Sequence, residues 1–102
     1  MKIYPKKRWG QNFLIDPNIL RKIVRTIDPK PGDIIIEIGA GKGALTQFLV
    51  ESKATIHTFE IDSDLIPALK DKFSNKINFI LHQEDALNFN YSRLFKSNKK
   101  VR

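Results

Sequence analysis

The stretch Ile34-Ile35-Ile36-Glu37-Ile38-Gly39-Ala40-Gly41-Lys42-Gly43-Ala44-Leu45-Thr46 decides the fold. It begins with an apolar, β-branched run, which is typical of a strand buried on both faces. Three glycines at alternating positions follow, and the spacing of the apolar residues after them predicts a helix through about residue 52. Strand, glycine loop and helix in this order predict the start of a nucleotide-binding α/β unit, because glycines let the backbone approach a ligand and the helix N-terminus faces it.

The composition sets the limits of this interpretation. The 102 residues suffice for one small domain, and 41% hydrophobic with 28% charged residues is typical of a globular protein. The absence of cysteine excludes disulfides and thiolate metal sites, and two histidines alone do not make a zinc site, so no metal is expected. No apolar run approaches the ~20 residues needed to span a membrane, and the basic start has no apolar run behind it. A cytoplasmic protein is expected.

The net charge of +7 is unevenly distributed. Residues 1–30 carry eight Lys/Arg against two Asp, residues 31–90 carry five Lys against nine acids, and residues 91–102 carry five Lys/Arg and no acid. Basic ends around an acidic centre suggest a polyanionic partner such as nucleic acid, although basic ends also simply keep a small domain in solution. The candidates for phosphate contact, which could equally form a solvated basic face, are Lys6, Lys7, Arg8, Arg21, Lys22 and Arg25.

The rest of the chain alternates helices and strands. Asp16-Pro17 predicts a helix start, and an apolar stripe continues this helix to Ile27. Asp62-Ser63-Asp64 and Pro67 predict another helix that starts near residue 63. The remaining expected elements are strands at 54–60 and 76–81 and one helical turn at 91–95. This order predicts an α/β fold whose parallel three-stranded sheet has the strand order 3-2-1.

The strand at residues 34–38 would normally lie in the middle of a larger sheet. In this chain it is expected at an open edge, which is a liability for a strand. We therefore expect either that the chain is part of a larger enzyme or that a partner covers the edge, with self-association through residues 34–38 as one route.

The glycine loop alone does not identify the nucleotide. Gly39, Gly41 and Ala44 fit the dinucleotide pattern with Glu60 about 20 residues further on, whereas the E-x-G-x-G-x-G spacing is equally that of S-adenosylmethionine enzymes. Glu37 before the loop, the helix before the first strand and the acids after the third strand favour S-adenosylmethionine over NAD. Acids suit a cationic sulfonium and ammonium, while they would repel a pyrophosphate. Glu37 could also be a core acid with satisfied hydrogen bonds.

Four segments together resemble the ribosomal RNA adenine dimethyltransferase family, and most closely its small-subunit (16S) branch linked to kasugamycin sensitivity. They are Arg8-Trp9-Gly10-Gln11-Asn12-Phe13-Leu14, Glu37 to Thr46, Phe59-Glu60-Ile61-Asp62 and Gln83-Glu84-Asp85-Ala86-Leu87. The resemblance implies a Rossmann-like methyltransferase fold, S-adenosylmethionine as cofactor, and dimethylation of two adjacent adenines of ribosomal RNA in the immature 30S subunit. Ala40, Lys42 and Trp9 depart from the usual family residues without removing a contact that depends on side-chain chemistry.

The resemblance also implies roles for individual residues. Asn12 and Leu14 would line the methionine side of the cofactor, while Gly39 and Gly41 would let the backbone pass beneath it. Glu60 would bind the ribose hydroxyls, and Ile61 would pack on the adenine. Asp85 would accept a hydrogen bond from the adenine amino group, and the Ala86 backbone would reach the ring. Leu14 and Ile61 could instead be plain core residues, and His57 and His82 are given no functional role.

One family motif is absent from these 102 residues. The family's Asn-Leu-Pro-Tyr catalytic loop follows a fourth strand, yet none of the five prolines stands in such a sequence. We therefore expect an N-terminal part of a methyltransferase domain, with a basic segment at 1–15 and a partial Rossmann-like unit at 16–102, without the catalytic loop and the helical RNA-binding domain. Such a chain would bind cofactor without transferring methyl groups. The alternatives are a non-enzymatic RNA-binding module and an NAD-binding domain.

Overall fold

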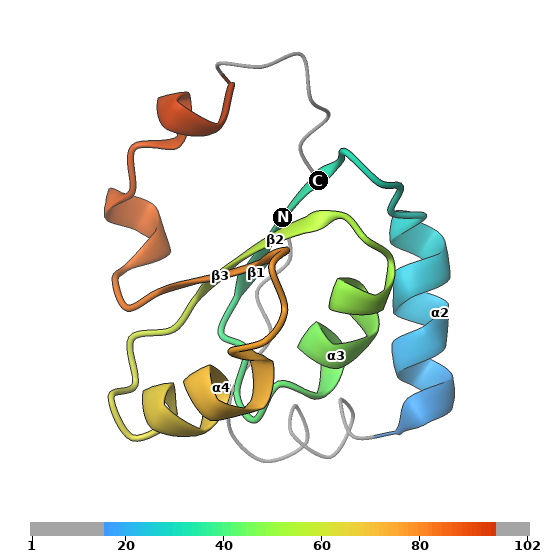
Figure 1. Ribbon diagram of the computed structural model, residues 1–102, viewed down its shortest axis with the longest axis horizontal. Coiled ribbons are helices and arrows are strands. Elements are labelled where there is room, and N and C mark those ends of the chain that lie inside the picture. The colour runs from blue at the N-terminus through green and yellow to red at the C-terminus, as the bar shows by residue number, and fades with distance from the viewer. Residues whose placement is uncertain (1–15, 96–102) are drawn as a thin grey trace.

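The computed structural model describes residues 16–95 (Figure 1). Three strands form one parallel sheet in the order β1-β2-β3, which confirms the predicted order. The elements in chain order are α2 (Pro17–Ile27), β1 (Ile34–Ile38), α3 (Ala44–Glu51), β2 (Thr55–Phe59), α4 (Ile66–Phe73), β3 (Phe79–His82) and the 3₁₀ helices η1 (Ala86–Asn88) and η2 (Tyr91–Phe95).

The three α-helices pack on one face of the sheet, as Figure 1 shows. Successive side chains of a strand point to opposite faces, so Ile35 and Ile56 meet the helices while His57 and Phe59 face away from them. The ring of Phe59 contacts residues of the segment that follows β3. The core on the helical face is formed by Leu20, Ile35, Leu45, Leu49, Val50, Ala54, Ile56, Leu69 and Phe73.

The predicted start of α2 is confirmed. Asp16 is the N-cap, its carboxylate accepts a hydrogen bond of 2.9 Å from the Asn18 amide, and Pro17 occupies the first turn. The helix ends at Ile27, and the φ of 51° at the C-cap residue Asp28 takes the chain out of the helical conformation.

Two boundaries differ from the prediction. The helix expected near residue 63 begins at Ile66, because Asp62 forms a local turn in which its carboxylate accepts from the Asp64 amide at 2.9 Å and its carbonyl accepts from the Leu65 amide. Short acidic side chains compete with helix formation in this way. The third strand begins at Phe79 rather than residue 76, since the Lys76 carbonyl accepts from the Phe79 amide in a turn.

Strand β1 lies at an edge of the sheet, as predicted: within residues 16–95 it pairs with β2 alone. It is nevertheless well covered, and Ile34 and Ile35 are both buried. Within the same residues, no helix is long and apolar enough to cross a membrane.

We predict that Gly43→Ala destabilises the chain by more than Gly32→Ala. Both glycines have positive φ, so either substitution strains the backbone. Only at Gly43 would the new Cβ lie 2.8 Å from Phe73 Cε2, whereas at Gly32 it would meet no atom within 4 Å. Overpacking of this kind costs about 1–3 kcal/mol, which is the expected difference between the two variants in urea unfolding. Equal losses would contradict the packing role of Gly43.

Candidate nucleotide-binding site

The glycine loop joins the end of β1 to the start of α3. Gly39, Gly41 and Gly43 have φ values of 74°, 61° and 86°, which a residue with a Cβ rarely adopts. The Gly39 amide donates to the Phe59 carbonyl at 2.8 Å, so the loop begins anchored to the end of β2. A Cβ at Gly39 or Gly41 would meet no atom within 4 Å, in contrast to Gly43. The first two glycines therefore leave open space beside the backbone, into which a ligand can approach.

Glu60 reaches from the end of β2 to this loop. Its side chain is only 1% exposed, and its Oε1 accepts a hydrogen bond of 3.2 Å from the Gly41 amide. Its Oε2 accepts from the Asp62 amide at 3.1 Å. An ionised carboxylate has about four acceptor positions, so one carboxylate can serve both amides at once. The structure thus brings two of the sequence-predicted residues, Glu60 and Gly41, into contact.

Ile61 points outward beside Glu60. It is 66% exposed, so the alternative that it is a plain core residue is wrong. Leu87, which follows the end of β3, is 80% exposed. The two strands end side by side, since the Glu60 amide donates to the His82 carbonyl at 3.0 Å. Exposed apolar side chains thus follow both strands at the end of the sheet that carries the glycine loop.

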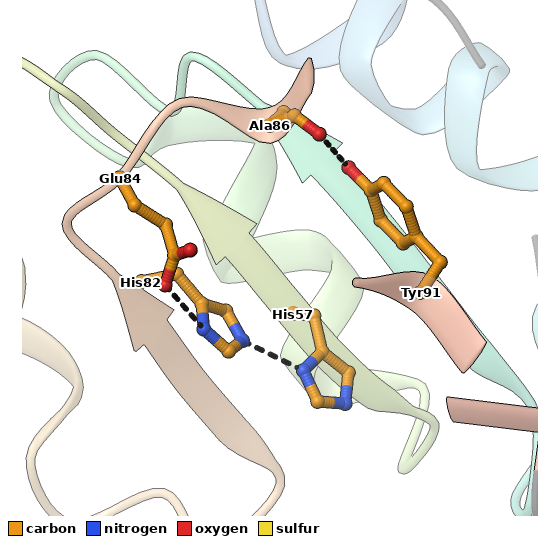
Figure 2. A network of polar contacts seen from close by, with 5 residues as sticks. All are labelled: His57, His82, Glu84, Ala86 and Tyr91. Atoms are coloured by element: carbon orange, nitrogen blue, oxygen red, sulfur yellow. Dashed lines mark hydrogen bonds and ion pairs between the residues drawn. The ribbon is translucent and has the colours of Figure 1, made fainter. Parts of the chain in front are cut away.

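Asp85 and Ala86 also follow β3. The Asp85 carboxylate caps η1 by accepting a hydrogen bond of 2.9 Å from the Leu87 amide. Ala86 is buried, and its carbonyl accepts from the Tyr91 hydroxyl at 2.6 Å (Figure 2). Partial burial and the charges of Asp85 and Glu84 raise the pKa of Tyr91. Hydrogen bonds between its own residues therefore hold the segment from Asp85 to Tyr91 in place.

Two groups of predicted residues are not brought to this site. Asn12, Leu14, Lys6, Lys7 and Arg8 lie outside the described residues, and their roles stay predictions. Arg21 and Arg25 line an open groove between α2 and the C-terminal half of α3, away from the glycine loop, with Val24, Phe48, Glu51 and Ser52. The Arg21 guanidinium lies 5.5 Å from the centre of the Phe48 ring. Lys22 is exposed and does not line the groove.

Glu37 is buried and its hydrogen bonds are satisfied, as expected for the alternative that it is a core acid. It is 7% exposed, and its Oε1 accepts from the hydroxyls of Thr46 at 2.6 Å and Thr58 at 2.9 Å. Burial raises the pKa of Glu37, the two hydroxyl bonds act in the opposite direction, and the charge of Glu60 adds to the rise. The spacing of the acids in the sequence gives no sign of this three-residue contact.

The two histidines form a pair that sequence reasoning missed. His57 Nδ1 lies 2.9 Å from His82 Nε2, and the other ring nitrogen of His82 lies 3.8 Å from a carboxylate oxygen of Glu84 (Figure 2). The His82 ring stacks on Phe59 at 4.5 Å and meets the edge of Phe89. Only the register of β2 with β3 brings the two rings together, so residue spacing could not find them. Among the described residues, no three His, Cys, Asp or Glu side chains are grouped to hold a metal ion.

The parallel sheet, its glycine loop and the acids at the strand ends define the fold of S-adenosylmethionine-dependent methyltransferases. Solved methyltransferases below 20% identity share this fold, among them coclaurine N-methyltransferase bound to N-methylheliamine and SAH (TM-score 0.63; 72% of this chain and 23% of that chain). A model described as ribosomal RNA adenine dimethylase matches residues 4–102. The chain belongs to the ribosomal RNA adenine dimethylase family, whose cofactor is the predicted S-adenosylmethionine.

Individual relatives are similar to the chain over most of its length. Ribosomal RNA small subunit methyltransferase A of Marinobacter nauticus is 48% identical over 89 residues, which are 87% of this chain and 32% of the relative. The 23S rRNA methyltransferase ErmE is 31% identical with a TM-score of 0.70, covering 76% of this chain and 32% of that one. A dimethyladenosine transferase from Plasmodium falciparum is 33% identical with a TM-score of 0.65, covering 74% and 28%. The chain thus spans about a third of the length of the curated relatives it matches.

We predict that the stability of the chain falls as the pH drops from 7.5 to 5.5. Burial and the neighbouring His82 lower the pKa of His57 from its ordinary value of 6.5. The unfolded chain then binds this proton more readily than the folded chain, so the stabilisation is present above pH 6.5 and is lost as the pH falls below it. Urea unfolding at pH 7.5, 6.5 and 5.5 measures this slope.

The His57→Gln variant is the control, because its side-chain amide can still form a hydrogen bond with His82 while it cannot titrate. Its unfolding free energy should depend less on pH than that of the wild type. The raised pKa of Glu37 acts with the opposite sign, since the folded chain then holds the proton more tightly. A slope that the His57→Gln substitution leaves unchanged would refute the assignment.

Proposed function

We propose that this chain is the cofactor-binding, N-terminal part of an S-adenosylmethionine-dependent enzyme that dimethylates two adjacent adenines of small-subunit ribosomal RNA in the immature 30S subunit. The observation that carries the proposal is the buried Glu60 carboxylate bound to the Gly41 amide at the ends of the strands, with Ile61 exposed beside it. The names of the relatives support the RNA substrate.

The residues present fit this cofactor. The Glu60 carboxylate lies at the glycine loop, where ribose hydroxyls would meet it, and the exposed Ile61 offers an apolar surface for the adenine. The exposed Asp85 carboxylate would accept a hydrogen bond from the adenine amino group. Gly39 and Gly41 leave the open space that a Cβ would fill. When bound, the cofactor supplies a methyl group on a cationic sulfur, and the nearby acids favour that charge while they disfavour a pyrophosphate. Asn12, Leu14 and the Ala86 backbone complete the proposed set.

The proposed contribution of these 102 residues is binding rather than transfer. Catalysis by positioning needs a group that holds the adenine amino nitrogen against the methyl carbon, and the family's Asn-Leu-Pro-Tyr loop does not occur in this sequence. We therefore propose the domain division stated from the sequence, a basic segment at 1–15 and a partial Rossmann-like unit at 16–102. Incubation with labelled cofactor and ribosomal RNA should give no methylated adenine.

We predict that Glu60→Gln weakens S-adenosylmethionine binding about 10- to 100-fold, because hydrogen bonds to a charged group contribute about 1.5–3 kcal/mol. Isothermal calorimetry of the 102-residue chain measures the affinity, and Asp71→Asn, which changes an exposed acid of α4, should leave it unchanged. NAD should not bind. Binding of NAD without S-adenosylmethionine would instead favour a dinucleotide domain.

We also propose that Arg21 and Arg25 contact RNA phosphates from the groove beside Phe48, and that Lys6, Lys7, Arg8 and Lys22 extend this basic surface. The support is chemical, because two guanidinium groups beside an aromatic ring suit a phosphate and a base.

The double variant Arg21→Ala/Arg25→Ala should bind a ribosomal RNA hairpin about 3- to 10-fold more weakly. The slope of log affinity against log salt should become shallower by about 1–2, since each phosphate contact releases a counterion. Filter binding at 50–200 mM salt measures both quantities. Lys76→Ala, at an exposed lysine elsewhere, is the matched control. An unchanged slope in the double variant would remove these arginines from the interface.

A last proposal concerns the edge of β1 that pairs with no strand among residues 16–95. The Thr55 amide donates to the Asp33 carbonyl and the Gly39 amide to the Phe59 carbonyl, so the alternate residues Ile34, Ile36 and Ile38 direct their backbone groups away from β2. We propose that a second copy of the 102-residue chain pairs with this edge. Sedimentation at rising concentration tests it, and a monomer throughout would refute it.

A further inference from the structure

One buried side chain joins three elements directly beneath the glycine loop. Glu37 belongs to β1, Thr46 to the first turn of α3 and Thr58 to β2, and all three are buried. A single oxygen, Glu37 Oε1, accepts both threonine hydroxyls at 2.6 and 2.9 Å. The hydroxyls must therefore donate, and the glutamate serves as their shared acceptor.

The two threonine hydroxyls connect Glu37 to different parts of the fold. The loop is anchored at its start by the Gly39 amide on Phe59 and in its middle by the Gly41 amide on Glu60. The loop ends at the start of α3, where the N-cap residue is Gly43, which has no side chain to cap the helix. Thr46 follows Gly43 by three residues, so its bond to Glu37 ties the first turn of the helix to β1. Thr58 lies within β2, whose position the sheet already fixes.

We propose that Glu37 is a positioning residue that sets the end of the glycine loop for the cofactor by holding Thr46. The inference rests on the proposed function, because it names a further residue for the same cofactor site. Glu37 acts through the helix and the loop backbone, so it is not assigned a contact with the cofactor. What the geometry requires is an acceptor oxygen at this place, and the amide oxygen of glutamine is also one.

Matched variants separate this role from a purely structural one. Thr46→Val and Thr58→Val each remove one hydroxyl bond to the same oxygen with little change of shape, and both should destabilise the chain in urea. Only Thr46→Val should weaken the affinity for S-adenosylmethionine, by 10-fold or more, while Thr58→Val changes it less than 3-fold. Thr46→Ser, which keeps the hydroxyl, and Glu37→Gln should both bind within 3-fold of the wild type.

Amide hydrogen exchange of the ligand-free chain gives a readout that does not depend on the cofactor. Thr46→Val should speed exchange at Gly41 and Gly43 at least 5-fold more than Thr58→Val does, because the loop end is released. Equal effects of the two valine variants on exchange and affinity would overturn the inference. So would a Glu37→Gln chain that loses S-adenosylmethionine while it keeps S-adenosylhomocysteine, because the charge would then be what matters.

A wild-type chain that binds no S-adenosylmethionine would refute the proposed function. The exchange comparison distinguishes that result from a failure of the present inference. Faster exchange in Thr46→Val alone would still support Glu37 as the residue that positions the loop, and equal exchange would reject it.

Discussion

The hydrogen bond from the Gly41 amide to Glu60 is the contact on which the rest of the site depends. A buried carboxylate is costly unless donors surround it, and here the donors include backbone amides of the loop and of the following turn. The contact also stabilises the loop, because a buried backbone amide without a hydrogen-bond acceptor is unfavourable. Loop shape and carboxylate position are therefore fixed together.

The sheet separates two environments around this contact. On the helical face, apolar packing and the Glu37 cluster hold the start of α3. On the opposite face, Phe59 and His82 stack, and Phe89 and Tyr91 close over them. Tyr91 then bonds the Ala86 carbonyl, so aromatic packing fixes the segment that carries Asp85. The candidate site lies at the ends of the strands, between the glycine loop that leads into α3 and the segment that carries Asp85.

The main features of the fold were predictable because their signals are local. The apolar run at Ile34–Ile38, the Asp16-Pro17 start and the alternation of elements give the parallel sheet and its order. The glycine loop and Glu60 were found by spacing, and the family by motifs. The start of α4 was misplaced because Asp62 bonds its own turn. The Glu37 and histidine contacts depend on register between strands, which no pattern along the chain encodes.

The hydrogen bonds that the two strand-end acids accept from backbone amides have an entropic consequence. Glu60 is fixed by two amides and Asp85 by the Leu87 amide, so neither side chain is free to sample many rotamers. Immobilising a flexible side chain on binding costs about 0.5–1.5 kcal/mol, and here that ordering has already occurred during folding. The acids are preorganised: whatever donors they meet gain hydrogen bonds without a further loss of side-chain freedom.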